Sequence, residues 1–189
     1  MELTPLELVR QHTREAHETL EKKMHVDRIM AGTLEPGQLV QLLQVNAHFL
    51  EAVERNALRF AQLVPFVVPR SALAVEDLRN MGAGPLPRTH ELDAWDMDQV
   101  RGGLYVALGS LLGGSVIASK LKGVPGLPAG QRFYALDQQA LAVWRNFLAH
   151  LATLQGSQTR EGLVHGARRT FQLAAESCDA ISSAQHPVP

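Results

Sequence analysis

Apolar residues recur every three or four positions along several long segments of the chain, the spacing of one face of an α-helix. No segment of similar length alternates apolar and polar residues, as a half-buried strand would. The pattern therefore predicts an all-α fold, a single-domain bundle of six to seven helices. We expect the domain to span residues 1–183 and the tail, 184–189, to be disordered.

Capping residues and prolines mark where the predicted helices begin. Thr4 is a capping residue, Pro5 suits the first helical position, and Glu7 completes a capping box. The other helices are predicted to begin at Pro36, near Ser71, after Asp96, after Asp137, and at Ser157 or Thr159.

The segment 99–122 is predicted to be a helix although it is rich in glycine. Five glycines interrupt its uncharged part: Gly102, Gly103, Gly109, Gly113 and Gly114. Each costs roughly 1 kcal/mol relative to alanine inside a helix. Three explanations stay open: close packing against another helix, a membrane span with a GxxxG motif, or a flat ligand against a kinked helix. Because serines and a tyrosine dilute the apolar run, we expect no membrane span.

The first predicted helix carries a histidine among its apolar residues. Since His17 falls between apolar positions at helical spacing, we expect it on the buried face, as a core residue or as a ligand. Arg10 and Arg14 are predicted at the edge of that face. The face consists of Leu6, Val9, Thr13, Ala16, His17, Leu20 and Met24.

Composition excludes several classes of function. The formal net charge is −1, with both signs interspersed, so we expect no nucleic-acid partner. Cys178 is the only cysteine, which excludes a disulfide framework. The first residues lack the basic and apolar regions of a secretory signal, so a cytoplasmic protein is expected. The chain contains no P-loop, GxSxG, HExxH or cysteine–histidine zinc motif.

The histidine and the glycine-rich helix together fit one kind of ligand. A neutral imidazole is a good axial ligand for haem iron. Glycines let a helix backbone approach a planar ring, and arginines near the histidine pair with carboxylates at the ring edge. His17, Arg10 and Arg14 with the segment 99–122 therefore favour a haem site.

Two motifs resemble those of the haem oxygenase family, in particular its bacterial, biliverdin-producing branch. The segment TREAHETLE, 13–21, is similar to the family's proximal helix, and LYVALGSLLGG, 104–114, is similar to its distal helix. The segment WRNF, 144–147, and Phe171 resemble later family positions. The resemblance spans about residues 5–180 and implies the family's helical fold, with a kinked glycine-rich distal helix.

The resemblance also implies the roles of individual residues. His17 would be the axial ligand of the haem iron, and Glu21 would lie near its second nitrogen. Many animal members carry an aspartate after the first distal glycine, where this chain has Ser110, as the bacterial branch commonly does. Ser110, Gly109 and Gly113 would take part in catalysis beside His17. The implied haem-binding residues are His17, Arg10, Thr13, Arg14, Glu21, Tyr105, Gly109, Ser110, Gly113 and Gly114.

The activity implied is cleavage of haem b with O2 to biliverdin, carbon monoxide and ferrous iron. Electrons would come from a ferredoxin or flavoprotein reductase, docked on Arg14, Lys22, Lys23, Lys120 or Lys122, and the protein would be a monomer. One alternative is a haem-binding carrier or sensor without turnover. Another is an enzyme of a related all-α scaffold acting on a small molecule, for which Cys178 is a poor nucleophile.

Overall fold

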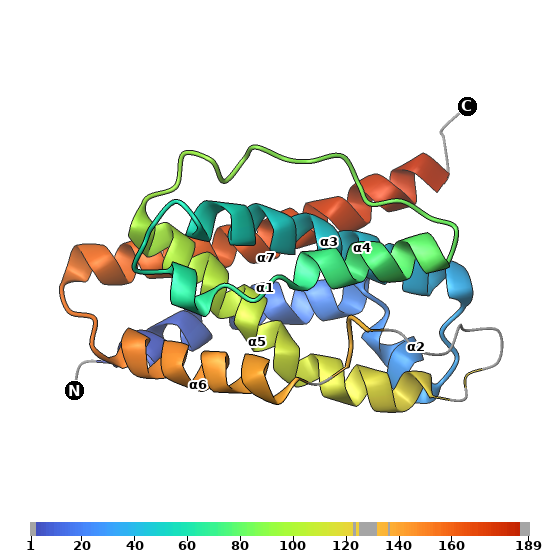
Figure 1. Cartoon of the computed structure of the whole chain (residues 1–189), viewed down its shortest axis with the longest axis horizontal. Helices are drawn as coiled ribbons and strands as arrows, with labels where there is room; N and C mark the ends of the chain where they lie inside the picture. Colours follow the sequence, from blue (N-terminus) through green and yellow to red (C-terminus); the bar gives the residue numbers. More distant parts are fainter. Residues whose placement is uncertain (1–2, 123, 125–131, 136, 186–189) are drawn as a thin grey trace.

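The protein is a bundle of α-helices, which confirms the predicted all-α fold class. The computed structural model describes residues 3–122, 124, 132–135 and 137–185. These residues form seven α-helices, a 3-10 helix at Val64–Phe66 and no strand. Figure 1 shows their arrangement. The α-helices are α1 (Pro5–Lys23), α2 (Val26–Ala31), α3 (Pro36–Ala57), α4 (Arg70–Asn80), α5 (Met97–Leu121), α6 (Gln138–Ala152) and α7 (Ser157–Gln185).

Most predicted helix starts are confirmed, and their caps are present. The Thr4 hydroxyl accepts the backbone N–H of Glu7, whose carboxylate accepts the backbone N–H of Thr4. Asp96 forms a second capping box at the start of α5. The six-residue helix α2 was not predicted, because so short a helix gives no periodic pattern.

The end of the domain differs slightly from its predicted position. Helix α7 continues to Gln185, two residues beyond the predicted boundary at 183. The rest of the predicted tail, 186–189, lies outside the described residues.

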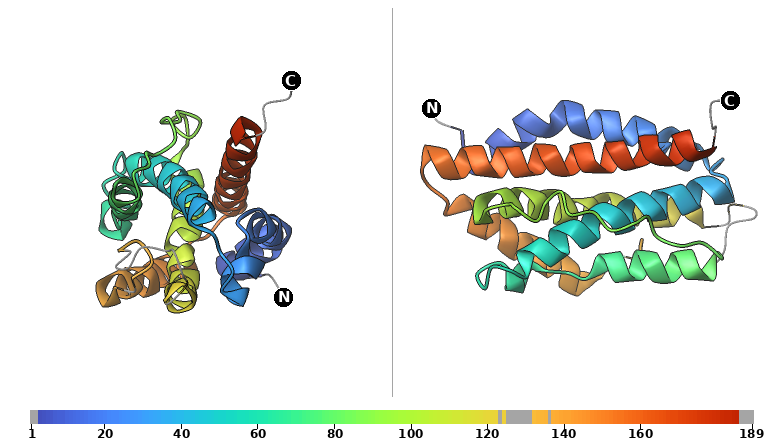
Figure 2. Two further views of the ribbon diagram at one scale, coloured as in Figure 1. Left: turned by 90° about the vertical axis from the view of Figure 1, so that its right-hand side faces the viewer. Right: turned by 90° about the horizontal axis from the view of Figure 1, so that it is seen from above.

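Helix α7 provides the surface on which α1, α3 and α5 pack. In the views of Figure 2, α1 runs beside α7 in the same direction, whereas α5 crosses it. Helix α4 packs on α3, and α6 packs on α5. The core is apolar, and its fully buried side chains include Leu39, Leu43 and Leu50 of α3, Leu104 of α5, Phe147 of α6 and Leu163 of α7.

Glycines allow α5 and α7 to cross with their backbones in contact. A Cβ atom on Gly102 would lie 2.2 Å from the carbonyl oxygen of Leu163, and one on Gly166 would lie 1.9 Å from that of Gln99. A Cβ atom on Gly103 would lie close to several side chains, among them that of Trp95 at 3.2 Å. Close helix packing therefore explains the first two glycines of α5. Beyond the crossing α5 changes direction (Figure 1).

Close helix packing does not explain the three later glycines of α5, which are Gly109, Gly113 and Gly114. Within the described residues, and apart from the backbone of α5 itself, no atom lies within 4 Å of the position that a Cβ of Gly113 would take, and the nearest neighbours of Gly109 and Gly114 are at 3.8 and 3.9 Å. Packing within the chain does not require glycine at these positions.

Helix α5 is long and apolar enough to cross a membrane by length and composition alone. In the structure it packs on α2, α3, α6 and α7. One such helix does not by itself indicate a membrane protein.

Alanine substitutions should change the free energy of unfolding in opposite directions at the helix crossing and beyond it. We expect G166A to lower the free energy of unfolding by about 1–3 kcal/mol, because its methyl group would overlap the backbone of α5. G113A should raise it by about 0.5–1 kcal/mol, because alanine loses less backbone entropy in a helix and meets no neighbour. Urea denaturation of the ligand-free protein measures both, and a loss of stability in G113A would contradict the distinction.

Candidate functional site

His17 lies on an exposed flank of α1, and its predicted burial is wrong. Its side chain is 55% exposed. The helix buries Pro5, Val9, Thr13 and Leu20. His17 is rotated by most of a quarter turn from Val9, toward Arg10, so it falls at the border of the buried face. A periodic pattern identifies the centre of such a face but does not assign residues at its border.

Two contacts orient the His17 ring. Its Nδ1 atom lies 3.7 Å from Oε1 of Glu21, one turn further along α1. This distance fits an ion pair, and it is too long for a hydrogen bond. The ring stands edge-on to that of Phe171 on α7, with 5.5 Å between centroids and an interplanar angle of 87°. With Nδ1 directed to Glu21, Nε2 is the nitrogen available to a ligand.

One face of α5 carries apolar or missing side chains that remain accessible. Tyr105, Gly109, Leu112, Gly113 and Val116 recur at spacings of three and four, which places them on the same face. Leu112 is 51% exposed and Val116 is 47% exposed. Exposed apolar side chains next to glycines are typical of a surface that binds an apolar ligand. We refer to these five residues as the glycine face.

The flank of α1 that carries His17 lies close to the Tyr105 end of this glycine face. Arg10 is on that flank, and its guanidinium is near enough to the Tyr105 hydroxyl to lower the pKa of that group. Burial raises the pKa of Tyr105, and the Arg10 guanidinium partly opposes that shift. The Tyr105 ring also contacts Trp144 of α6, with centroids 5.9 Å apart. The flank of α1 that carries Arg10 and His17 thus lies on the same side of α5 as Tyr105.

Ser110 lies at the border of the glycine face and is bonded to a buried arginine of α4. Nη1 of Arg70 donates to the Ser110 hydroxyl over 2.6 Å and to the Ala107 carbonyl over 3.2 Å. The Ser110 hydroxyl in turn donates to the Ala107 carbonyl over 2.8 Å. The hydroxyl proton of Ser110 is therefore used in a hydrogen bond within α5, and the group that donates to the Ser110 oxygen is the Arg70 guanidinium.

Burial and contacts with neighbouring groups fix the position of the Arg70 side chain. It is 4% exposed, and its guanidinium lies over the Phe133 ring, 4.6 Å from the centroid. The Glu54 carboxylate accepts the backbone N–H groups of Arg70 and Ser71, at 2.9 and 3.0 Å, and so caps α4. Burial lowers the pKa of Arg70 to about 10, which leaves it charged at neutral pH. Burial also raises the pKa of Glu54, and its hydrogen bonds from Ser71 and Arg70 oppose that shift.

The structure brings together some of the predicted site residues and separates others. His17, Arg10, Glu21, Tyr105, Gly109 and Gly113 lie on the flank of α1 that carries His17 or on the glycine face, and Arg14 is exposed beside them. Thr13 is 3% exposed, and its hydroxyl donates to the Val9 carbonyl, so it lies in the core. Gly114 is buried toward Arg70 and Tyr134. Sequence reasoning missed Arg70, because no motif connects it with Ser110 forty positions later.

A comparison by sequence finds one relative. The haem oxygenase of Xanthomonas campestris pv. campestris is 39% identical to this chain over 114 residues. The chain is similar in sequence to this haem oxygenase. The matched region covers 54% of the chain and 66% of that relative, so it spans slightly less than two thirds of the relative's length. No protein-family model matches the chain.

Comparisons by structure show the haem oxygenase fold over nearly the whole chain. The NO- and CO-bound haem oxygenase of Neisseria meningitidis has a TM-score of 0.75 at 20% identity and covers 95% of this chain and 92% of that chain. The Synechocystis haem oxygenase in complex with haem has a TM-score of 0.74 at 17% identity, with coverages of 96% and 94%. The Leptospira interrogans enzyme has a TM-score of 0.71 at 18% identity, with coverages of 94% and 100%.

The hydrogen bond between Arg70 and Ser110 should contribute measurably to stability. We expect S110A to lower the free energy of unfolding by about 1–3 kcal/mol, because a buried guanidinium loses an acceptor. Ser115 is a matched control on the same helix, since its hydroxyl donates to the Leu112 carbonyl and to no other group of the described residues. Chemical denaturation of S110A and S115A measures the difference, and equal effects would show that Arg70 gains nothing from Ser110.

Proposed function

We propose that this protein binds haem between α1 and the glycine face of α5 and cleaves it with O2 to biliverdin, carbon monoxide and ferrous iron. The observation that carries the proposal is the half-exposed His17 imidazole on the flank of α1 that lies close to the Tyr105 end of this surface. The sequence similarity to the Xanthomonas haem oxygenase supports the same activity. Among the structural relatives, the Synechocystis enzyme is described in complex with haem.

The residues present fit the chemistry of haem. His17 supplies an imidazole nitrogen for the iron, and Glu21 orients the ring from its other nitrogen. Leu112 and Val116 offer apolar surface to the macrocycle, and the absence of a side chain at Gly113 leaves room for it. Arg10 and Arg14 lie on the same flank as His17, where the propionate carboxylates would be bound.

The protein contributes position, polarity and exclusion of water to the reaction. When bound, haem supplies the iron that activates O2 and the meso carbon that is attacked. Gly109 and Gly113 let the α5 backbone approach one face of the ring, which restricts the reactive edge. The Ser110 oxygen, polarised by the Arg70 guanidinium, offers a hydrogen-bonding group at the border of that face. We assign to this pair the role that an aspartate has in many animal members.

We further propose a cytoplasmic, monomeric enzyme that receives its electrons from a ferredoxin or flavoprotein reductase. Nothing in the composition suggests a bound flavin or iron–sulfur cluster, since Cys178 is the only cysteine.

A haemin titration followed by aerobic reduction tests the proposed activity. We expect a stoichiometric Soret band of histidine-ligated haem that decays into the spectrum of biliverdin once ascorbate is added. A Soret band that persists through reduction would instead indicate a haem carrier or sensor. The absence of any Soret band would refute the haem site.

Replacement of the proposed iron ligand gives a sharper test of its role. We expect H17A to lose the spectrum of imidazole-ligated ferric haem and nearly all turnover, because no other nitrogen ligand lies on that flank of α1. H12A is the matched control, since His12 is an exposed histidine on the opposite flank of the same helix. Absorbance and electron paramagnetic resonance spectra of the haemin complexes measure the change. Unchanged spectra in H17A would remove His17 from the site.

A further inference from the structure

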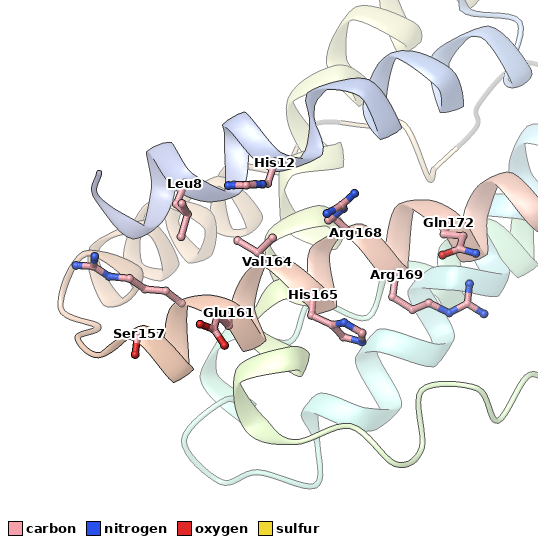
Figure 3. Close-up of a pocket in the computed structure, with 10 residues that line it drawn as sticks. Leu8, His12, Ser157, Glu161, Val164, His165, Arg168, Arg169 and Gln172 are labelled. Carbon is pink, nitrogen blue, oxygen red and sulfur yellow. The ribbon is translucent and has the colours of Figure 1, made fainter. Parts of the chain in front are cut away.

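The groove between α1 and α7 is a concave surface of about 650 Å³, shown in Figure 3. It is lined by residues of α1 and α7 alone, so the glycine face of α5 is not part of it. It has no excess of positive charge, because Arg169 is paired with Glu91 and Glu176 and the Glu161 carboxylate lines the same groove. The side chains that can influence the glycine face therefore lie elsewhere, around Arg70.

A short segment that follows α5 in the sequence, residues 132–134, packs against Arg70. Phe133 is 2% exposed, and the Arg70 guanidinium carbon lies over its ring, 4.6 Å from the centroid. The ring of Tyr134 is 4.8 Å from that of Phe133, and it lies 3.9 Å from the position that a Cβ of Gly114 would take. The segment therefore contacts both the buried guanidinium and the later half of α5.

The Asp77 carboxylate of α4 fixes the backbone of this segment. It is 3% exposed, and its two oxygens accept the backbone N–H groups of Arg132 over 3.0 Å and of Phe133 over 2.8 Å. These hydrogen bonds offset the cost of removing the carboxylate from water. Asp77 follows Arg70 by about two turns of α4, so one helix supplies both the guanidinium and the group that fixes its aromatic neighbour.

The aromatic ring, rather than a carboxylate, holds the head group of Arg70. The Glu54 carboxylate accepts the backbone N–H groups of Arg70 and Ser71, not those of the guanidinium. A guanidinium over an aromatic ring is stabilised most where both are removed from water, as they are here. From this position Nη1 donates to the Ser110 hydroxyl over 2.6 Å. The Phe133 ring thus restricts where the N–H groups of Arg70 can point.

We propose that Phe133 and Asp77 are positioning residues for haem cleavage. Asp77 fixes the segment 132–134, and the Phe133 ring holds the Arg70 guanidinium against Ser110. The inference rests on the proposed function, because the Ser110 hydroxyl influences the reaction only if haem binds at the glycine face. Both residues act through Arg70: without them the guanidinium moves away, and the Ser110 oxygen loses its hydrogen-bond donor.

Nuclear magnetic resonance of the ligand-free protein tests the positioning. The guanidinium N–H signals of Arg70 are assigned by their absence in R70K, and their exchange with water is measured. We expect F133L to speed this exchange about tenfold, the size that the loss of a buried cation–π contact implies. D77N should act in the same direction, because its amide keeps one acceptor oxygen but turns an NH2 group toward the second backbone N–H.

Two matched variants separate positioning from a general loss of packing. F49L makes the same substitution at a 2% exposed phenylalanine of α3. E76Q removes a carboxylate charge next to Asp77, where Glu76 forms an exposed ion pair with Arg132. Both variants should leave the Arg70 signals unchanged. Unchanged exchange in both F133L and D77N, or an equal increase in F49L and F133L, would overturn the proposal.

Haem breakdown driven by ascorbate tests the consequence for the reaction. F133L should bind haemin with the affinity of the wild type and form biliverdin about tenfold more slowly, because Ser110 loses its polarising donor. The C–O stretching frequency of the ferrous CO complex, which responds to polar groups near the ligand, should shift in F133L and not in F49L. A wild-type rate in F133L despite faster exchange would overturn the role in the reaction. Failure of the wild type to degrade haem would refute the proposed function, whereas the exchange measurement would still decide how Arg70 is positioned.

Discussion

The contact between the backbones of α5 and α7 determines the geometry of the proposed site. Gly102 on α5 and Gly166 on α7 have no room for a Cβ atom, because each meets the backbone of the other helix. This contact holds the start of α5 against the helix on which α1 also packs. Further along, α5 runs past α1, where the Arg10 guanidinium lies near the Tyr105 hydroxyl. The same helix is thus packed tightly at one end and accessible at the other.

Two polar arrangements support this apolar surface from opposite directions. Glu21 of α1 and Phe171 of α7 orient the His17 ring, so that one imidazole nitrogen remains available. Behind α5, Glu54 caps α4 and fixes the position from which Arg70 reaches Ser110. A charged side chain buried to this extent is costly unless its hydrogen bonds are made, and Arg70 donates to Ser110 and to the Ala107 carbonyl. Its guanidinium is thereby held at the border of the glycine face.

The sequence predicted the helices well and the site only in part. Periodicity and caps located α1, α3, α5, α6 and α7, because these features are local. The pattern left two explanations of the α5 glycines open, and the structure shows that the packing explanation applies to Gly102 and Gly103. The exposure of His17 depends on how far α7 covers the border of the buried face of α1. The periodicity of one helix carries no information on the position of its neighbour. Arg70 was missed because its partner Ser110 is distant in the sequence.

Hydrogen exchange of the protein with and without haemin tests most directly whether the flank of α1 and the glycine face of α5 hold one ligand. Mass spectrometry of peptic fragments reports exchange separately for α1, α5 and α7. The account predicts that haemin slows exchange around His17, in 14–21, and along the glycine face, in 105–117, and that the groove residues of α7 change little. Protection confined to the groove between α1 and α7, or no protection in α5, would contradict the proposed location of the haem.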